Sequence, residues 1–190
     1  MAVGVLGGVF DPPHEGHLAL ARAAIGELRL DTLLVLVVAE PGHKHAATPS
    51  ETRLELTRLA FRDVPHVSVE LDHHARTVDS LEERRLPNDT YFVLGADELA
   101  DFESWKAPQR VIELVRLAVA MRPGVERDEV SAVRRRLRAG ERIVAFEMDP
   151  LPISSSEIRA RVARHETIDH LVPARVAAEI ARLGLYGRPE

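Results

Sequence analysis

Two histidines stand three positions apart in the stretch GGVFDPPHEGH, residues 7–17. The stretch follows an apolar, β-branched run at 3–10 and precedes a run of helical spacing, so it lies where a strand becomes a helix. A helix beginning near Gly16 offers free N–H groups and the positive end of its dipole to an anion. His14 and His17 can each donate a hydrogen bond to a phosphate oxygen or take up a proton as charge builds. The stretch therefore predicts a phosphate site.

The glycine pair and the absence of cysteine help to separate this interpretation from its alternatives. Gly7 and Gly8 carry no Cβ, so their backbone can approach a ligand closely. The histidines could instead bind a metal or simply lie at the surface. A metal needs further ligands, and a third ligand is not evident in a chain that has no cysteine. The full string after a strand favours phosphate over both alternatives.

A second candidate for anion binding is ISSSEIR, residues 153–159. Serines 154 to 156 are good helix N-cap residues, and Glu157 suits a first turn. Arg159 lies one turn in, where its guanidinium can reach an anion held at the same helix N-terminus. The alternative is only a well-capped helix. Two such helix beginnings could converge on one polyphosphate.

The elements that must position these motifs alternate along the chain. Apolar strands are expected at residues 3–10, 32–39, 66–71, 91–94, 117–121 and 143–147. Helices are expected from residue 18, at 49–61, 77–86, 98–102, 108–115, 128–139, 154–165 and 173–185. Thr48 to Glu51 has the pattern of a capping box, with Pro49 as the first helical residue.

This alternation predicts an α/β fold, a doubly wound parallel sheet covered on both faces. We expect a single domain over residues 1–190, with a core at 1–148 and a small helical subdomain at 149–190 on the C-terminal edge of the sheet.

Composition narrows the class of protein. Apolar residues make up 45% of the 190 and charged residues 29%, which is typical of a globular domain. A net charge of −5 argues against a general nucleic-acid-binding surface. We expect no signal peptide and no membrane span, because the longest apolar run covers only residues 33–39. The absence of cysteine fits a reducing cytoplasm.

The two motifs together resemble those of the nucleotidylyltransferase superfamily, which carries (H/T)xGH in a Rossmann-like domain and an ISSTxIR element. Members transfer a nucleoside monophosphate from ATP or CTP to a phosphate-bearing acceptor and release pyrophosphate. Further segments resemble the bacterial nicotinate mononucleotide adenylyltransferases within it. They are EPGHK at 40–44, ARTVDSL at 75–81, GADELADFESW at 95–105, MRPG at 121–124 and LVPARVAAEIARLGLY at 171–186.

The resemblance implies adenylyl transfer from ATP to nicotinate mononucleotide, with Mg²⁺ bound mainly through the ATP phosphates and no protein metal site. It implies catalysis by His14, His17 and Arg159. It implies ATP binding by Gly7, Gly8, Val9, Phe10, His14, His17, Gly95, Asp97, Ile153, Ser154, Ser155, Ser156 and Arg159. It implies acceptor binding by Asp11, Lys44, Arg76, Thr77, Trp105 and Arg122. The segment Asp72-His73-His74 is interpreted as a solvated turn.

Several alternatives remain open at the level of sequence. Arg76 stands where the family has Tyr and adds a cation near the expected acceptor site. Trp105 could pack in the core instead of stacking on a pyridine ring, and Asp97 could cap a helix. The acceptor could be nicotinamide mononucleotide or phosphopantetheine, the nucleotide could be CTP, or the chain could be a non-catalytic nucleotide-binding module. No oligomer is indicated by the sequence.

Overall fold

A six-stranded parallel sheet forms the centre of the protein. The computed structural model describes residues 1–42, 46–121, 128–149 and 151–187. Neighbouring strands are all parallel, and their order reverses between β1 and β4, where such sheets leave a crevice for a ligand. The expected doubly wound α/β fold is therefore confirmed. In sheet order, the strands are β3 (Val67–Asp72), β2 (Thr32–Val38), β1 (Val3–Gly8), β4 (Tyr91–Gly95), β5 (Arg116–Met121) and β6 (Ile143–Glu147).

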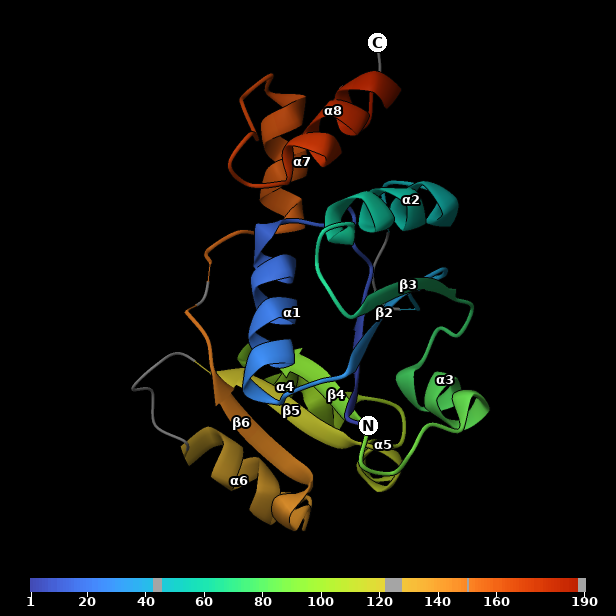
Figure 1. The fold of residues 1–190 in the computed structure, drawn as a ribbon, viewed down its shortest axis with the longest axis vertical. Coiled ribbons are helices and arrows are strands. Elements are labelled where there is room, and N and C mark those ends of the chain that lie inside the picture. The colour runs from blue at the N-terminus through green and yellow to red at the C-terminus, as the bar shows by residue number, and fades with distance from the viewer. Residues whose placement is uncertain (43–45, 122–127, 150, 188–190) are drawn as a thin grey trace.

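Helices cover both faces of this sheet (Figure 1). One face packs against α1 (Glu15–Glu27), α2 (Ser50–Phe61), α7 (Ser155–Ala163) and α8 (Ala174–Leu183). The other packs against α3 (Thr77–Arg84), α4 (Ala96–Asp101), α5 (Pro108–Leu114) and α6 (Asp128–Arg136). Short 3-10 turns lie at Phe102–Ser104 and Gly140–Arg142. Within the described ranges, no helix combines the length and apolarity that crossing a membrane requires.

Strand β2 shows why the strands read as continuous apolar runs. Leu33, Val35 and Val37 belong to the hydrophobic cluster on the α1 side. Leu34 and Leu36 belong to the cluster on the opposite side. Because successive side chains of a strand point to opposite faces, a sheet covered on both faces needs apolar residues at every position.

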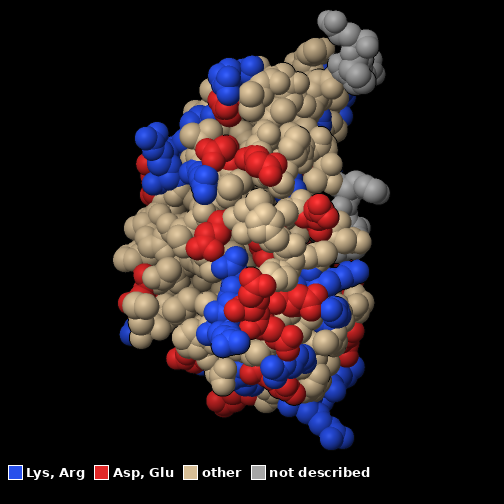
Figure 2. Space-filling model, turned by 90° about the vertical axis from the view of Figure 1, so that its right-hand side faces the viewer, with Lys and Arg blue, Asp and Glu red and all other residues tan. Residues whose placement is uncertain are grey.

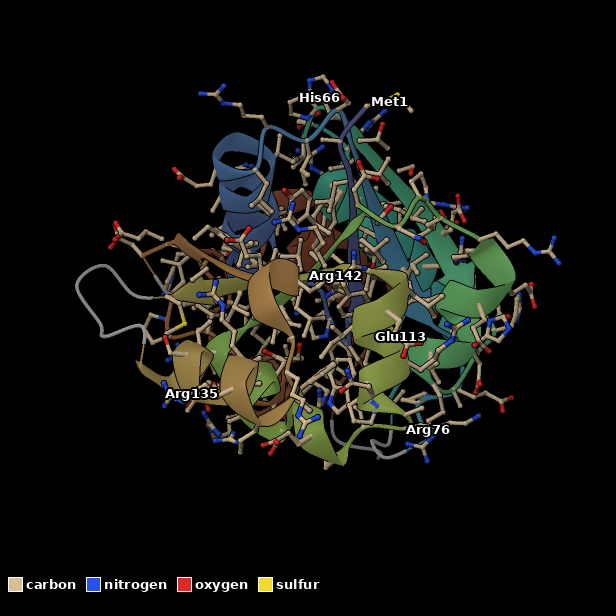
Figure 3. The ribbon with its side chains drawn as sticks, turned by 90° about the horizontal axis from the view of Figure 1, so that it is seen from below. Met1, His66, Arg76, Glu113, Arg135 and Arg142 are labelled. Carbon is tan, nitrogen blue, oxygen red and sulfur yellow. The ribbon has the colours of Figure 1, made fainter. Side chains whose placement is uncertain are left out.

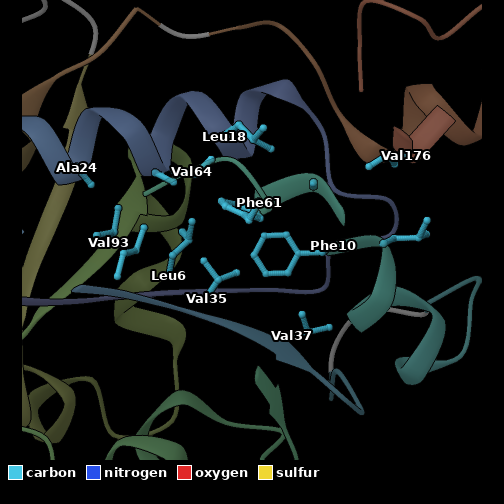
Figure 4. Packing of buried hydrophobic residues seen from close by; sticks show 14 of the residues in the cluster. Leu6, Phe10, Leu18, Ala24, Val35, Val37, Phe61, Val64, Val93 and Val176 are labelled. Carbon is cyan, nitrogen blue, oxygen red and sulfur yellow. The ribbon is translucent and has the colours of Figure 1, made fainter. Parts of the chain in front are cut away.

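The C-terminal helices share the core of the α1 side. Ile158 of α7 and Val176 of α8 are fully buried in the same cluster as Phe10 and Leu18. Figure 4 shows Val176 approaching this cluster from beyond Phe10. In Figure 1, α7 and α8 lie above the carboxyl ends of the strands. This packing brings residues 155–183 next to the end of β1. Whether residues 149–190 form a separate subdomain stays a prediction.

Contacts away from the carboxyl ends of the strands stabilise the packing of the helices on the sheet. Arg142, labelled in Figure 3, donates to the carbonyls of Ile112 (2.8 Å) and Glu113 (3.1 Å) at the end of α5. Figure 2 shows positive and negative side chains side by side over the lower part of one face. Among the exposed ion pairs, Arg110 pairs with Glu82 at 2.9 Å. Exposed pairs of this kind add little stability.

The predicted capping box at the start of α2 is wrong. The helix begins at Ser50, and its N-cap residue is Pro49, with no side-chain cap hydrogen bond. The hydroxyl of Thr48 donates to the carboxylate of Asp11 instead. The Thr48 hydroxyl is therefore oriented by an acceptor 37 positions away in sequence, and the helix begins two residues later.

A buried arginine joins the ends of two strands to the start of α2. The side chain of Arg53 is 1% exposed and donates to the carbonyls of Val9 (2.8 Å), Val38 (2.7 Å), Ala39 (2.7 Å) and Thr48 (3.0 Å). Burial lowers its pKa, and the nearby carboxylate of Asp11 opposes that shift. A buried guanidinium is tolerated only when its donors are occupied. Arg53 therefore fixes the backbone on which the candidate site is built.

We expect Arg53→Met to lower the free energy of unfolding by roughly 3 kcal/mol, because it keeps much of the side-chain volume but removes the donor for four carbonyls. Urea denaturation measures the change. Arg58→Met on the same helix is the matched control, since Arg58 makes only an exposed pair with Glu55. Equal losses in the two variants would contradict the role given to Arg53.

Candidate active site

The turn between β1 and α1 lies at the carboxyl end of the central strand. Phe10 has φ 51°, in the left-handed region, and this turns the chain after β1 ends at Gly8. The Phe10 ring is 2% exposed and meets the ring of His17 edge-on, with centroids 4.8 Å apart. A Cβ on Gly8 would lie 2.9 Å from the Phe10 ring. Packing of Phe10 therefore requires the glycine at position 8, and ligand approach at Gly7 and Gly8 stays a prediction.

The two histidines of this turn stack on each other. Their ring centroids are 3.7 Å apart with an interplanar angle of 28°. The backbone N–H of His14, the N-cap residue of α1, donates to Nδ1 of His17 at 3.2 Å. A backbone amide can only donate, so Nδ1 of His17 must be the accepting nitrogen. The neutral ring of His17 then carries its proton on Nε2, as a fixed hydrogen-bond donor.

Both rings are neutral at pH 7 in the unliganded protein. Burial lowers the pKa of His14 to about 4. Burial, and next the neighbouring His14, lower the pKa of His17 well below its usual value. A bound polyphosphate would oppose these shifts, since an opposite charge favours the cationic form. Protonation of His17 would also break its bond from the His14 amide, so His14 is the better proton acceptor of the two.

The second motif docks directly onto this turn. Ser154 is the N-cap residue of α7, and its hydroxyl oxygen accepts from the Glu157 N–H at 3.2 Å, as the sequence predicts. The hydroxyl of Ser155 donates to the carbonyl of Pro12 at 2.9 Å. Arg159 donates to the carbonyl of Asp11 at 2.7 Å. The expected convergence of the two helix beginnings is confirmed, whereas phosphate binding by them stays a prediction.

Asp11 has a different environment from the one expected. Its side chain is 3% exposed. One carboxylate oxygen accepts from the hydroxyls of Thr48 and Tyr186, and the other accepts from the N–H of Ala47. A buried carboxylate whose two oxygens already have donors is a structural junction. This placement argues against the direct acceptor contact that the sequence suggests for Asp11.

Gly95 and Asp97, two further ATP-side predictions, lie at and just after the carboxyl end of β4. Gly95 is the N-cap residue of α4, and its N–H donates to the carboxylate of Glu98 at 3.1 Å. The alternative that Asp97 caps this helix is therefore wrong, because Asp97 lies exposed within its first turn. β4 pairs in parallel with β1, which places Gly95 and Asp97 at the same edge of the sheet as the histidine turn. A ribose contact by Asp97 stays a prediction.

The acceptor-side residues treated next lie at two places, the start of α3 and the end of the 3-10 turn at Phe102–Ser104. Arg76 is the N-cap residue of α3, exposed at the rim in Figure 3, and a Cβ on Gly42 would lie 3.5 Å from its Cζ. Thr77 is the first residue of α3. Trp105 is partly buried, with its ring packed on Phe102 at 5.2 Å and Phe92 at 6.0 Å. The packing alternative for Trp105 is thus present, and stacking on an acceptor stays a prediction.

Two acceptor-side predictions, Lys44 and Arg122, fall outside the residues that the structure describes.

From the sequence, Asp72-His73-His74 is interpreted as a solvated turn. The structure shows that only part of this turn is exposed. Asp72 is 5% exposed and contacts Nδ1 of His74 at 3.0 Å, while Nε2 of His74 lies 3.0 Å from Glu83. The Asp72 hydrogen bond is the main cause that raises the pKa of His74. Only His73 is exposed. Over the described part of the chain, no group of three or more His, Asp or Glu side chains is arranged to hold a metal ion.

Three residues were not predicted from the sequence as parts of the site. They are Arg53, Thr48, whose hydroxyl donates to Asp11, and Tyr186. Arg53 gave a signal, because it occupies the buried stripe of α2 with Leu56, Thr57 and Ala60. Tyr186 gave none, since its partner is 175 positions away.

Comparisons with known proteins agree with this geometry. The cytidylyltransferase-like family matches residues 5–161. Curated proteins named probable nicotinate-nucleotide adenylyltransferase are similar over nearly the whole chain. The one from Thermomicrobium roseum is 39% identical over 97% of this chain and 91% of its own length. The one from Bordetella petrii is 40% identical over 97% and 98%. One from Thermus thermophilus is 37% identical over 98% and 100%.

Solved structures give the same fold. Nicotinic acid mononucleotide adenylyltransferase of Plasmodium falciparum complexed with NaAD superposes with a TM-score of 0.80 at 19% identity, covering 97% of each chain. The same enzyme complexed with APC gives a TM-score of 0.78 at 18% identity, covering 97% of this chain and 96% of that one. At this identity the likeness concerns the fold alone.

The buried histidines make the stability of the fold depend on pH. Below pH 6.5 the unfolded chain binds protons at these rings more readily than the folded protein does, so the free energy of unfolding falls as the pH is lowered. We expect His14→Asn to reduce this fall by about 2 kcal/mol at pH 5. Urea denaturation between about pH 5 and pH 7.5 measures it. His73→Asn, at an exposed ring, should follow the wild type. Parallel pH curves for His14→Asn and the wild type would contradict the buried, neutral state of His14.

Proposed function

Because the chain belongs to the cytidylyltransferase-like family, among its nicotinate-nucleotide adenylyltransferases, we propose that it transfers the adenylyl group of ATP to nicotinate mononucleotide. The products are deamido-NAD and pyrophosphate, and the reaction is a step of NAD biosynthesis. The observation that carries the proposal is the meeting of two helix beginnings, since Arg159 of α7 bonds the backbone of the turn that holds His14 and His17.

The histidine turn supplies donors for the phosphates of ATP. Nε2–H of His17 is fixed as a donor by the bond at Nδ1, and it costs no reorganisation when charge develops on the α-phosphate. His14 can accept a proton as negative charge accumulates. Arg159 has five N–H donors and uses two of its nitrogens on Asp11 and Ser156, which leaves others for phosphate oxygens. These three are the proposed catalytic residues.

We propose that the reaction is a direct in-line displacement. A phosphate oxygen of the acceptor forms a bond to the α-phosphorus of ATP, the bond from that phosphorus to the bridging oxygen breaks, and the electron pair leaves with pyrophosphate. The acceptor is already an anionic nucleophile, so no covalent enzyme intermediate is required. Catalysis then consists of positioning and charge stabilisation.

The proposed binding surface for ATP follows the carboxyl edge of the sheet. The backbone of residues 7–10 would face the triphosphate, Gly95 and Asp97 the nucleoside, and Ile153 with Ser154, Ser155 and Ser156 the phosphates at the start of α7. On the acceptor side we propose Lys44, Arg76, Thr77, Trp105 and Arg122. Arg76 lies against Gly42 and would offer its cation to the carboxylate or phosphate of the acceptor.

The side chains of the candidate site are compatible with a Mg²⁺ ion that is bound by the nucleotide and not by the protein. They are imidazoles and a guanidinium, whereas Mg²⁺ prefers carboxylate and phosphate oxygens, and the carboxylate of Asp11 in the turn is already occupied. We propose that the ATP phosphates themselves would hold the ion, and that it would supply positive charge to them when bound.

The proposed partners are the two nucleotides, with neither nucleic acid nor membrane. A cytoplasmic location, where ATP is available, is part of the same proposal.

The direct test is pyrophosphate release from ATP by the purified chain. We expect rapid release with nicotinate mononucleotide and at least tenfold slower release with nicotinamide mononucleotide or phosphopantetheine, because a cationic acceptor site favours the nicotinate carboxylate. CTP in place of ATP is the nucleotide control. Release with none of the acceptors would overturn the enzyme assignment in favour of a nucleotide-binding module, and preferred release with phosphopantetheine would move the chain to another reaction.

Substitutions at position 17 separate catalysis from helix capping. Oδ1 of an asparagine can take the place of Nδ1 and keep the bond from the His14 amide, but it supplies no donor at Nε2. We expect both His17→Asn and His17→Ala to lower kcat by roughly 10²–10³. Only His17→Ala should also lose about 1 kcal/mol of folding stability. Steady-state kinetics and urea denaturation measure the two effects. An unchanged kcat in His17→Asn would rule out the proposed donor.

A further inference from the structure

A contact near the end of the described chain reaches back to its first loop. Tyr186 follows the end of α8, has φ 63°, and is partly buried. Its hydroxyl donates to Oδ1 of Asp11 at 2.7 Å and lies 3.1 Å from Oγ1 of Thr48. Burial raises the pKa of Tyr186, so the phenol keeps its proton and stays a donor. The hydroxyl thus ties the C-terminal helix pair to the turn after β1.

Asp11 connects this hydroxyl to both sides of the proposed active site. The N–H of Ala47 donates to Oδ2 of Asp11, which fixes the segment that leads from the acceptor-side loop into α2. The backbone carbonyl of the same residue accepts from Arg159 at 2.7 Å. The position of Asp11 therefore decides where the Arg159 guanidinium and segment 46–48 lie.

The carboxylate depends on its donors because it is buried. An ionised carboxylate that loses a hydrogen-bond donor inside a protein must shift towards water or towards another donor. Two of its three donors, from Thr48 and Ala47, belong to one segment, so they move together. Tyr186 is the donor that anchors Asp11 from a different part of the chain.

We propose that Tyr186 is a positioning residue for adenylyl transfer, acting through Asp11 on Arg159 and on segment 46–48. The Tyr186 hydroxyl forms hydrogen bonds with Asp11 and Thr48, so we expect it to affect the reaction through the residues that it positions. This inference rests on the proposed function for its kinetic consequence only. Its structural part, the fixing of Asp11, is measurable without any reaction.

The kinetic test uses the two tyrosines of the chain as a matched pair. Tyr186→Phe removes one hydroxyl from the junction. Tyr91→Phe removes the same atom at the amino end of β4, where the hydroxyl accepts from Arg116 at 3.2 Å. We expect Tyr186→Phe to lower kcat by roughly tenfold, the scale of a lost bond to a charged group, and Tyr91→Phe to leave it unchanged. Unchanged kcat and KM in Tyr186→Phe, with only a lower unfolding temperature, would reduce the residue to a stabilising one and overturn the proposal.

A double-mutant cycle tests whether the effect passes through Arg159. In an Arg159→Ala background we expect Tyr186→Phe to lower kcat by a smaller factor than in the wild type, because the part of its effect that passes through the guanidinium is gone and only the part that passes through segment 46–48 remains. Loss of the same factor in both backgrounds would show that Tyr186 acts independently of Arg159, contrary to the proposal.

Hydrogen exchange distinguishes failure of this inference from failure of the proposed function. We expect the amide of Ala47 to exchange roughly tenfold faster in Tyr186→Phe than in the wild type or Tyr91→Phe, since its acceptor is no longer held in place. Suppose that the amide of Ala47 exchanges faster in Tyr186→Phe but the wild type is inactive with every acceptor. That result would support the role of Tyr186 in fixing Asp11 and would refute only the proposed reaction. Unchanged exchange at Ala47 would refute the junction itself.

Discussion

The contact between the start of α7 and the turn before α1 is the constraint on which the candidate site depends. It joins residues 148 positions apart, through Arg159 and the carbonyl of Asp11, and Ser155 reinforces it at Pro12. Each helix beginning alone would be an ordinary anion-binding site. Held against each other, they would offer two imidazoles and a guanidinium to one ligand in the proposed reaction. The parallel sheet makes this possible, because its switch point lies at the carboxyl end of β1.

Buried polar groups hold this contact in place. Arg53 donates to the carbonyls around the ends of β1 and β2, and the carboxylate of Asp11 accepts from two segments, residues 47–48 and Tyr186. Burying such a group without its hydrogen-bond partners is unfavourable in free energy. The groups therefore favour the one backbone arrangement in which all partners are present. Burial keeps the pKa of both histidines low, so the stacked rings are neutral at pH 7 and two adjacent cations are avoided. A site arranged in advance in this way needs little reorganisation during the reaction.

Local pattern was sufficient for the strands, most helices and the Ser154 cap of the second motif, because hydrophobic periodicity and cap residues depend on short segments. It failed where a distant partner decides the outcome. Thr48 has the sequence of an N-cap, yet its hydroxyl bonds Asp11, and His74 lies in an apparent turn but is held by Asp72 and Glu83. Gly8 serves the packing of the Phe10 ring. These contacts join residues that only the folded chain brings together, so composition and spacing do not reveal them.

The central claim is that His14, His17 and Arg159 face one polyphosphate. Nuclear magnetic resonance of the ring nitrogens of His14 and His17 and of the Arg159 guanidinium, during titration with a non-hydrolysable ATP analogue, tests it most directly. The account predicts that all three side chains shift along one binding curve, with Nδ1 of His17 remaining unprotonated. Shifts of the histidines without Arg159, or shifts that follow two different affinities, would contradict it.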